Sequence, residues 1–514
     1  MKRLIALVAA LAMILTGCAI GGGADDAFVF ALSADIVNLT PILLTNVVSR
    51  TVSMQIHEPL VRYEGNNKLV AALATEWTQA DDGLSWTFKL RPDVKWHDGE
   101  AFTAADVKYT YEALLDPSNQ SVHRTNYEMI EKIETPDDLT VVFQLKESHG
   151  PFLDKVAQLP IMAEHHVPEV GFENYNMNPI GTGPFKYVEW VPNDHFTVEA
   201  NAEYWGGEPA LATVVFRPIP EASVRAMALS KGEIDYAAGL TAEDFAGMQD
   251  SKALTTFSIP QLTFAYLGYN NRNALFQDRR VREAMAYTID QETIISDILK
   301  GAGRPSTGPI APINEEWYNP DVRTFTQDFD KAKQLLAEAG WTPGADGILV
   351  NSAGERFSFS VIIGSGNEQT KNQGILLQSW LAQVGIEMKL EFLDWSLMNA
   401  RLDARDYEAM MLSMSPSADP DQYNYWHSSS ISGGFNDWCY SNPEVDSLLE
   451  QGRRESDPAA RKEIYNRVQE ILAEDVATLW LYHRNELAAL NSSYTGMTEE
   501  AAGQYQLLYK VQPK

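Results

Sequence analysis

Residues 84–107 of the chain read LSWTFKLRPDVKWHDGEAFTAADV. The first seven residues alternate, with Trp86, Phe88 and Leu90 on one face, and a period of two predicts a β-strand with one buried side. Thr103 and Asp106 then form a capping-box pattern, which predicts that a helix begins there. A strand and a capped helix this close together favour a mixed α and β architecture.

The same patterns recur along the rest of the chain. Residues 139–145 predict a second strand, with Val141, Phe143 and Leu145 on one face. Asp278 and Asp457 are expected to cap two further helices, and a helix close to the first is expected to end at Lys300-Gly301. The helix capped by Asp278 is predicted to bury Val281, Met285 and Ile289. The helix capped by Asp457 is predicted to bury Ile464, Val468 and Leu472. No repeat of 20–50 residues accompanies them, so the fold class is predicted as α/β or α+β.

The first residues have the pattern of a targeting segment. Lys2 and Arg3 precede an apolar run over 4–14, which is too short to span a bilayer and has the length of a signal-peptide core. The run ends at Leu15-Thr16-Gly17-Cys18, which resembles the lipobox of bacterial lipoproteins, the alternative being an ordinary secretory signal with a chance cysteine. The resemblance implies a signal peptide over 1–17, a lipid on Cys18 and a flexible tether over 18–26.

Composition limits the classes of function. The formal net charge of −30 disfavours nucleic acid and anionic lipid surfaces as partners. The chain has 2 cysteines, so lipidation of Cys18 would leave Cys439 without a disulfide partner, and we expect it to be a small buried residue. The length predicts two or three domains.

Sequence signatures of catalysis and cofactor binding are missing. Residues 181–184 (GTGP) lack the lysine and third glycine of nucleotide-binding loops, and 364–366 (GSG) do not make a nucleophile elbow. His165 and His166 are adjacent and therefore diverge, which disfavours a shared metal. We therefore predict no cofactor, no metal and no enzymatic activity.

Ordered motifs over almost the whole chain after residue 26 resemble the family 5 solute-binding proteins of ABC importers. The motifs are LATEW (73–77), DGL (82–84), FKLR (88–91), WHDG (96–99), TAADV (103–107), GTGPF (181–185), NAEYW (201–205), GEID (232–235), NN (270–271), FQDRRVR (276–282), AGW (339–341), VGI (384–386), DPD (419–421) and NPEVD (442–446). The family collects oligopeptides, dipeptides, nickel complexes and related solutes.

This resemblance implies a bilobed, periplasmic-binding-protein-like fold whose lobes close on the solute through a hinge. Lobe I is expected to contain residues 27–56, 181–268 and 488–514, with an inserted subdomain over 57–180, and lobe II residues 269–487. The chain is expected to cross between lobes near Leu267–Asn270 and near Leu487.

The resemblance also implies a set of ligand-binding residues. They are Trp395, Ser413, Met414, Ser417, Asp419, Tyr423, Trp426, Tyr269 and Asn270. Trp395 is aligned with the cavity wall of peptide-binding relatives, the alternative being packing between lobes, and Tyr423 and Trp426 serve either stacking on the ligand or core packing. Many peptide binders hold the ligand ammonium with an aspartate three residues before an acid-Pro pair, but here that position is Pro416. Either Asp419 takes this role or the ligand presents no free amine there; the structural alternative is a turn-forming Asp-Pro.

The function expected from this resemblance is binding without chemistry. A monomeric, lipid-anchored protein outside the cytoplasm would capture a solute, a peptide above all, and deliver it to an ABC permease. The alternatives are a nickel chelate, an opine or a sugar as cargo on the same fold, or an extracellular hydrolase.

Overall fold

The computed structural model describes residues 27–64, 67–497 and 508–514. The predicted signal peptide over 1–17, Cys18 and the predicted tether over 18–26 all lie outside these residues. Within the described ranges, no helix combines the length and the apolar composition that crossing a bilayer requires.

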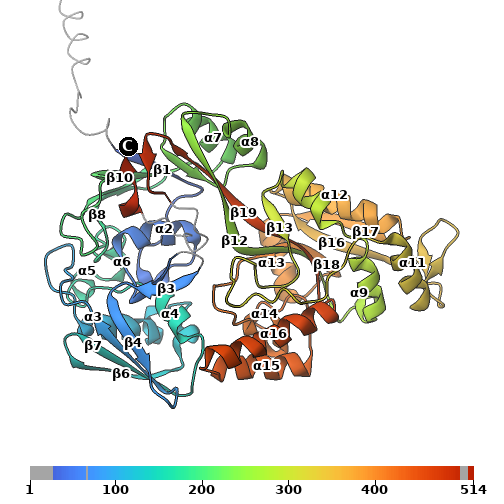
Figure 1. Cartoon of the computed structure of the whole chain (residues 1–514), viewed down its shortest axis with the longest axis horizontal. Helices are drawn as coiled ribbons and strands as arrows, with labels where there is room; N and C mark the ends of the chain where they lie inside the picture. The colour runs from blue at the N-terminus through green and yellow to red at the C-terminus, as the bar shows by residue number, and fades with distance from the viewer. Residues whose placement is uncertain (1–26, 65–66, 498–507) are drawn as a thin grey trace, which may run out of the picture.

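An 11-stranded mixed sheet forms the frame of the molecule (Figure 1). Its strands, in spatial order, are β17 (Glu387–Leu393), β16 (Ser358–Gly364), β18 (Ala409–Met414), β12 (Leu254–Tyr269), β19 (Leu479–Asn491), β11 (Tyr236–Ala238), β1 (Phe28–Leu32), β10 (Thr213–Pro218), β9 (His195–Ala200) and β8 (Phe185–Val191), with β13 (Gly303–Pro305) also paired to β19. The strands β8–β11 and β1 are called here the β1 side of the sheet, and β16–β18 the β16 side. The long antiparallel strands β12 and β19 connect the two sides.

Helices cover both faces of the sheet on each side. On the β1 side, α2 (Val47–Ile56) packs on one face, and α7 (Ala222–Ser230) and α8 (Ala242–Met248) pack on the other. On the β16 side, one face carries α9 (Arg279–Ala286), α11 (Phe329–Glu338) and α12 (Glu368–Ala382). The opposite face carries α13 (Trp395–Ala404), α14 (Tyr423–Trp426), α15 (Pro443–Arg454) and α16 (Pro458–Glu474). Successive residues of one strand point to opposite faces of the sheet. In β12, Leu267 packs in the core beneath α9, α11 and α12, and Tyr266 packs in the core beneath α13–α16.

A four-stranded antiparallel sheet, called here the small sheet, has a core of its own. Its strands are β4 (Ala74–Gln79), β5 (Ser85–Leu90), β7 (Thr140–Leu145) and β6 (Ile130–Asp137), with the hairpin β2 (Val61–Glu64) and β3 (Lys68–Ala71) and the helices α3 (Ala104–Leu115), α4 (Phe152–Gln158), α5 (Val167–Val170) and α6 (Phe172–Tyr175) nearby. The chain enters this region at His57 and leaves it at Gly183, whose N–H donates to the Ile56 carbonyl at 2.8 Å. A Cβ on Gly181 would lie 1.8 Å from the same carbonyl oxygen, so only glycine fits this contact.

The remaining elements are short. They are α10 (Gln291–Thr293), a π-helical turn over Ile294–Ile298, the strand pairs β14 (Thr342–Pro343) with β15 (Leu349–Val350) and β20 (Tyr494–Thr495) with β21 (Gln512–Pro513), and 3₁₀ turns at Pro41–Leu43, Pro117–Asn119, Arg124–Tyr127, Ala274–Phe276, Ser428–Ile431 and Leu508–Lys510.

Most of the local predictions are confirmed. β5 and β7 bury the predicted residues, and Thr103 and Asp106 form the capping box of α3. The side chains of Asp278 and Asp457 cap α9 and α16 as expected. Two details differ: Ile464 is only half-buried because Tyr465 takes the inward position, and Ile289 is buried but lies beyond the end of α9. Cys439 is buried, as predicted.

The connection between the two sides of the sheet lies earlier in β12 than the expected crossing. β12 pairs with β18 from Phe264 to Tyr269, so Leu267–Asn270 already lies among the strands of the β16 side and their flanking loops. The pairing of β12 with β19 shifts register between Pro260 and Phe264. This irregular stretch is where β12 passes from one side to the other.

Candidate functional site

Two hollows adjoin the strands that connect the sides of the sheet. Hollow A, of about 420 Å³, lies on the β16 side, and hollow B, of about 400 Å³, faces the β1 side. Hollow A is lined by residues 364–367 with Trp395, Ser413 and Arg484, among others. Hollow B is lined by 30–33, 47–48, Tyr236, 238–239, Thr263, Ser415, Arg484 and Glu486, among others. Because Arg484 lines both and neighbouring residues of β12 and β18 line one or the other, we treat the two hollows together as one cleft.

The cleft exposes a free strand edge. β16 pairs with β18 only as far as Met411, whereas the pairing of β18 with β12 continues to Met414. Leu412–Met414 therefore have a strand neighbour on one side only among the described residues. Leu412 and Ser413 also line hollow A, so their unpaired backbone groups lie beside open space. Such an edge can accept the backbone of an extended chain as an added strand.

Trp395 and Ser413 lie in the cleft. Trp395 is the first residue of α13, whose cap is Asp394, and it is 60% exposed while it lines hollow A. A large aromatic side chain that remains exposed beside a hollow is not used for packing between the two sides of this structure. Ser413 is exposed on β18, opposite Ala265 of β12.

The Asp419 carboxylate already forms an ion pair with an arginine of the same chain. Its carboxylate receives two short bonds from the Arg461 guanidinium, at 2.6 and 2.7 Å, and it also accepts the Asp421 N–H at 2.9 Å. Burial would raise the pKa of the Asp419 carboxyl, but Arg461 outweighs burial and the net shift of the pKa is downward. Asp419 is therefore a charged, paired turn residue rather than a carboxylate available to a ligand amine.

Two other predicted residues near Asp419 are partly covered. Met414 is half-buried against the core beneath α13–α16, and Ser417 is half-buried with its hydroxyl donating to the Asp419 carbonyl at 3.5 Å. Neither residue lines hollow A or hollow B.

Four predicted ligand residues pack within the protein instead. Trp426 is fully buried and stacked on Trp438 at 4.2 Å, and Tyr269 is fully buried with its hydroxyl donating to the Val476 carbonyl. Asn270 is buried, and its amide donates to the Tyr407 carbonyl at 3.4 Å. Tyr423 stacks on His427 at 4.0 Å beneath the Arg453 guanidinium. Trp426 and Tyr423 are placed as the packing alternative expected, and Tyr269 and Asn270 also make contacts within the protein. Sequence position beside a cleft motif does not fix the direction in which a side chain points.

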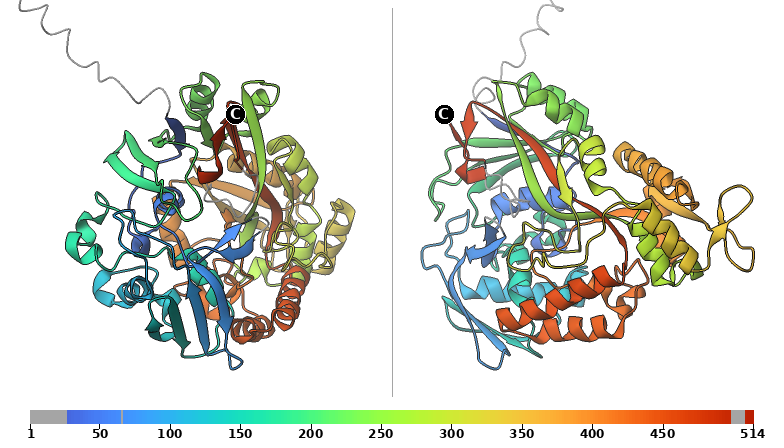
Figure 2. Two further views of the ribbon diagram at one scale, coloured as in Figure 1. Left: turned by 60° about the vertical axis from the view of Figure 1, so that its left-hand side comes forward. Right: turned by 45° about the vertical axis from the view of Figure 1, so that its right-hand side comes forward.

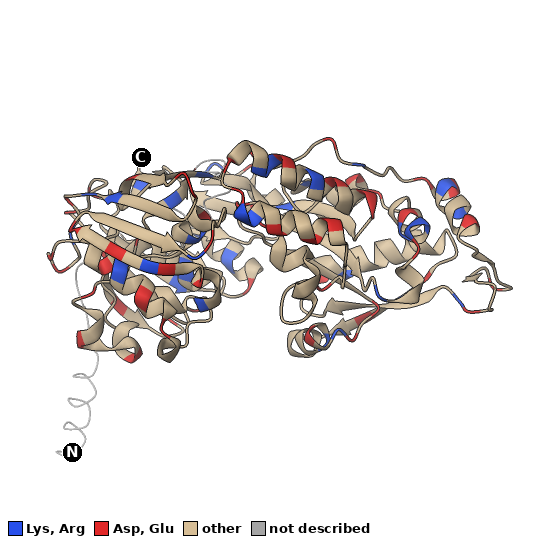
Figure 3. Cartoon of the chain, turned by 90° about the horizontal axis from the view of Figure 1, so that it is seen from below, with Lys and Arg blue, Asp and Glu red and all other residues tan. Residues whose placement is uncertain are grey.

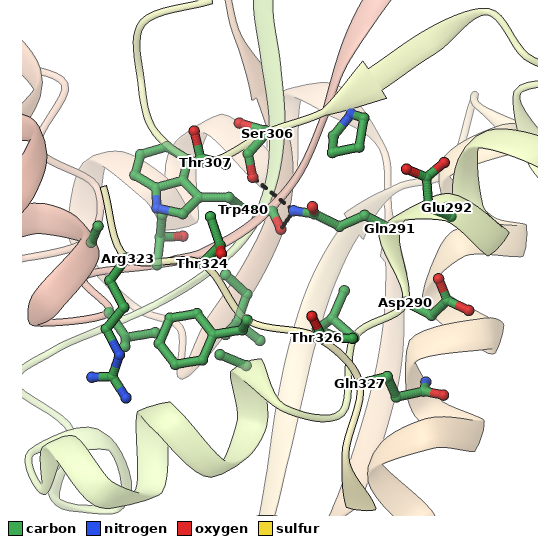
Figure 4. Close-up of a pocket in the computed structure, with 18 residues that line it drawn as sticks. Asp290, Gln291, Glu292, Ser306, Thr307, Arg323, Thr324, Thr326, Gln327 and Trp480 are labelled. Atoms are coloured by element: carbon green, nitrogen blue, oxygen red, sulfur yellow. Dashed lines mark hydrogen bonds between the residues drawn. The ribbon is translucent and has the colours of Figure 1, made fainter. Parts of the chain in front are cut away.

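Two further cavities lie apart from the cleft. One of about 300 Å³ separates the small-sheet region from α16, and Tyr63, Asp154, Trp317 and Arg461 are among its lining residues. The other, of about 290 Å³, lies between the α9–α10 turn, the end of β13 and the loop over 323–327 (Figure 4). In this second cavity Gln291 extends toward Ser306 and Trp480 and donates to both backbone carbonyls, at 2.7 and 2.8 Å.

Sequence reasoning missed several residues of the cleft. Arg484, Glu486 and Thr263 lie on β12 and β19, and Ser33 and Gly239 follow β1 and β11. Thr263 and Ser415 join across β12 and β18 by a 2.7 Å contact between their hydroxyl oxygens. No local pattern marks these positions, because only the pairing of distant strands brings them together.

Comparisons with known proteins place this arrangement in context. The family model for bacterial extracellular solute-binding proteins, family 5 Middle, matches residues 68–436. The oligopeptide-binding protein AppA of Bacillus subtilis (strain 168) is 33% identical over 465 residues, which cover 88% of this chain and 85% of AppA.

Two solved structures have the same fold over nearly their whole length. The structure of the Bacillus subtilis AppA in complex with a nonapeptide aligns with a TM-score of 0.79 and 30% identity, covering 95% of this chain and 99% of AppA. The ABC transporter substrate-binding protein CtaP of Listeria monocytogenes aligns with a TM-score of 0.85 and 26% identity, covering 96% and 99%.

Proposed function

The chain belongs to the bacterial extracellular solute-binding proteins of family 5, and we propose that it captures a peptide between two lobes and delivers it to an ABC importer. The observation that carries the proposal is the free edge of β18 at Leu412–Met414 beside the cleft. Backbone hydrogen bonds to such an edge do not depend on peptide sequence, so the edge suits a collector of varied peptides. The oligopeptide-binding relative and the nonapeptide complex support the same cargo class.

The division into lobes follows from the sheet. We propose that the β1 side with the small-sheet region is lobe I and the β16 side is lobe II, with crossings slightly earlier in the chain than those near Leu267–Asn270 and Leu487 that the resemblance implies. The connecting segments would then be the irregular stretch Pro260–Phe264 of β12 and the facing residues 483–485 of β19. A rotation about two such segments is a hinge motion, and a ligand that contacts both lobes shifts the population toward the closed form.

Binding and closure are tested together. The protein would be unfolded and refolded to remove any cargo, then titrated calorimetrically with a random pentapeptide mixture, with a nickel–histidine complex and with neutral sugars. We expect heat only from the peptides, and a smaller radius of gyration in small-angle scattering at saturation. Heat from the nickel complex or a sugar alone would transfer the assignment to a non-peptide cargo, and an unchanged radius at saturation would contradict lobe closure.

The alternative of an extracellular hydrolase is tested with the same mixture. Mass spectrometry after prolonged incubation should recover the peptides intact, because none of the cleft-lining residues described forms a nucleophile–base pair. Appearance of cleavage products that increases with protein concentration would favour the hydrolase.

The lipid anchor is a separate proposal that rests on Leu15–Cys18. Serine offers no thiol for a thioether, so Cys18→Ser should release the protein from membranes into the wash fraction. A variant that stays in the membrane fraction after detergent-free washing would show that Cys18 is not the anchor.

A further inference from the structure

Arg484 is a basic residue that lines both hollows of the cleft, and we propose that it binds a carboxylate of the cargo, so that the protein prefers peptides with an accessible acidic group. This inference rests on the proposed peptide-binding function and narrows its substrate class. Arg484 lies on β19 opposite Gly303 of β13, beside the irregular stretch where β12 passes between the two sides. It therefore lies at the junction of hollow A and hollow B.

The Arg484 guanidinium has capacity left for a ligand. Its side chain is 52% exposed, and its ion pair within the described residues is a 3.7 Å contact with Glu486 Oε2. Arg461, by comparison, is 6% exposed in its side chain and holds Asp419 through two bonds at 2.6 and 2.7 Å. A guanidinium has five N–H donors in a planar fork that fits a carboxylate, and one long contact leaves most of them available.

Glu486 keeps its negative charge near Arg484, but one of its two oxygens is held by the protein backbone. Its Oε1 accepts the Gly239 N–H at 2.6 Å, so this carboxylate is engaged with backbone on the β1 side. Among the described residues that line hollow A or hollow B, Arg484 and Glu486 are the charged ones. The remaining lining side chains are apolar, hydroxyl or amide groups, so no unpaired carboxylate there awaits a cation.

Two helix ends add to the positive potential of the cleft. Val47 and Val48 open α2 and line hollow B, and Gly366 and Asn367 precede α12 and line hollow A. The N-terminal end of a helix carries a partial positive charge, which favours an anionic neighbour. Glu368 in the first turn of α12 pairs with Lys371, and the first turn of α2 contains no acidic residue.

Among the described residues, the carboxylates near the cleft that could bind a ligand amine already have partners within the protein. Asp419 lines neither hollow, and its carboxylate is held by Arg461. The cleft thus offers a guanidinium that keeps most of its donors for an anion, whereas its one carboxylate among the described lining residues, that of Glu486, is already bound through Oε1 to the Gly239 N–H. Although the chain carries a net charge of −30, the local groups favour acidic cargo.

The test compares cargo charge with the Arg484 side chain. Refolded protein would be exposed to a random pentapeptide mixture of which half is C-terminally amidated, and retained peptides would be identified by mass spectrometry. We expect enrichment of peptides with a free C-terminus or with Asp or Glu. Calorimetry on one retained peptide would then compare the acid with its C-terminal amide and with its Glu→Gln or Asp→Asn form, which distinguishes the two sources of carboxylate.

Arg484→Gln should weaken binding of the acidic peptide about 10- to 100-fold, the range expected for hydrogen bonds between charged groups, and should leave its uncharged form within about twofold. Arg484→Lys keeps the positive charge and should therefore recover part of the lost affinity for the acidic peptide. It also replaces Arg484→Gln as the test variant if the glutamine variant folds poorly. Arg304→Gln is the matched control, since Arg304 is an exposed arginine on the neighbouring β13 that lines neither hollow.

Two outcomes would overturn the inference in distinguishable ways. If peptides bind wild type irrespective of carboxylates, or if Arg484→Gln weakens acidic and uncharged forms equally, Arg484 is not a carboxylate site although the peptide function stands. If no peptide is retained at all, the peptide function itself fails and this inference fails with it.

Discussion

At the scale of single residues, Trp395 is a large aromatic side chain that stays exposed beside the cleft. The sequence placed it beside a cavity or between lobes, and the structure leaves it 60% exposed at the rim of hollow A. An aromatic ring in this position can cover a bound peptide and lose most of its exposed area on binding.

Trp395→Ala should therefore weaken peptide binding by about 1–3 kcal/mol, or about 5- to 150-fold in affinity. Calorimetry with one retained peptide provides the measurement. Phe435→Ala is a suitable control, because Phe435 is 58% exposed on the same side of the sheet but lines neither hollow. Equal affinities for wild type and Trp395→Ala would remove this residue from the site.

Asp419 leads to a different prediction, since its carboxylate forms a buried pair with Arg461. Asp419→Asn leaves the guanidinium without its counter-charge, and the free energy of unfolding should fall by about 3–5 kcal/mol. Urea denaturation measures this loss. Asp346→Asn, which breaks the exposed pair with Arg356, should leave the free energy of unfolding nearly unchanged. If Asp419→Asn is as stable as wild type but binds peptide poorly, Asp419 is a ligand residue after all.

At the scale of elements, a glycine loop of the small-sheet region meets the end of α15. The Gly150 N–H donates to the Arg453 carbonyl at 2.6 Å, and the Ser148 hydroxyl donates to the Arg454 carbonyl at 2.8 Å. The last carbonyls of a helix have no partner within the helix, so the loop caps α15 from outside. In both views of Figure 2 the small sheet (blue) and the helices α15 and α16 (red) lie at the same end of the molecule.

Gly150→Ala should weaken this contact. An added Cβ would lie 2.7 Å from the Glu455 carbonyl oxygen and 2.8 Å from Arg461 Nε, so the loop must withdraw from the helix. Hydrogen exchange should accelerate at the end of α15 and at 147–154, while the rest of the large sheet keeps its protection. In Gly308→Ala the new Cβ meets open space, and exchange should be unchanged. Identical exchange in both variants would mean that the loop does not restrain α15.

At the scale of the whole molecule, buried histidines connect stability to pH. His483 is 3% exposed on β19, and burial lowers the pKa of its imidazole to about 4. His57 is fully buried, and the pKa of its imidazole falls to about 3 for the same reason. Since the unfolded chain binds these protons at a higher pH than the folded chain does, the stability is present above about pH 6.5 and is lost as pH falls toward the folded pKa values.

His483→Gln should reduce this acid sensitivity. A pKa lowered to about 4 makes His483 alone responsible for a loss of about 2 kcal/mol between neutral pH and pH 5. Urea denaturation at both pH values should show a smaller difference in the variant than in wild type. His195→Gln is the control, because hydrogen bonds to Asp194 and Glu189 raise the pKa of His195, whereas burial lowers that of His483. Removing His195 should therefore not reduce the loss of stability between neutral pH and pH 5. An unchanged pH difference in His483→Gln would exclude His483 as a source.

The net charge also belongs to the whole molecule. Acidic and basic residues are spread along the whole chain rather than gathered in one region (Figure 3). The net charge of −30 is therefore the total of many scattered charges. The cleft differs from this average, because a ligand interacts most strongly with the few charges nearest to it.

The sequence by itself determined the elements and the family. Alternating residues identified β5 and β7, capping side chains identified the start of α3, α9 and α16, and ordered motifs identified the solute-binding family, because each of these signals depends on neighbours in the chain. Only the tertiary structure decided which polar and aromatic residues face the cleft. Trp426 and Trp395 lie 31 positions apart in one aromatic-rich stretch, yet one is fully buried and the other exposed, since the direction of a side chain depends on what packs against it from distant segments. Arg484 could be placed only from the tertiary structure for the same reason: the pairing of β19 with β12 and β13, which no local pattern specifies, brings it beside both hollows of the cleft.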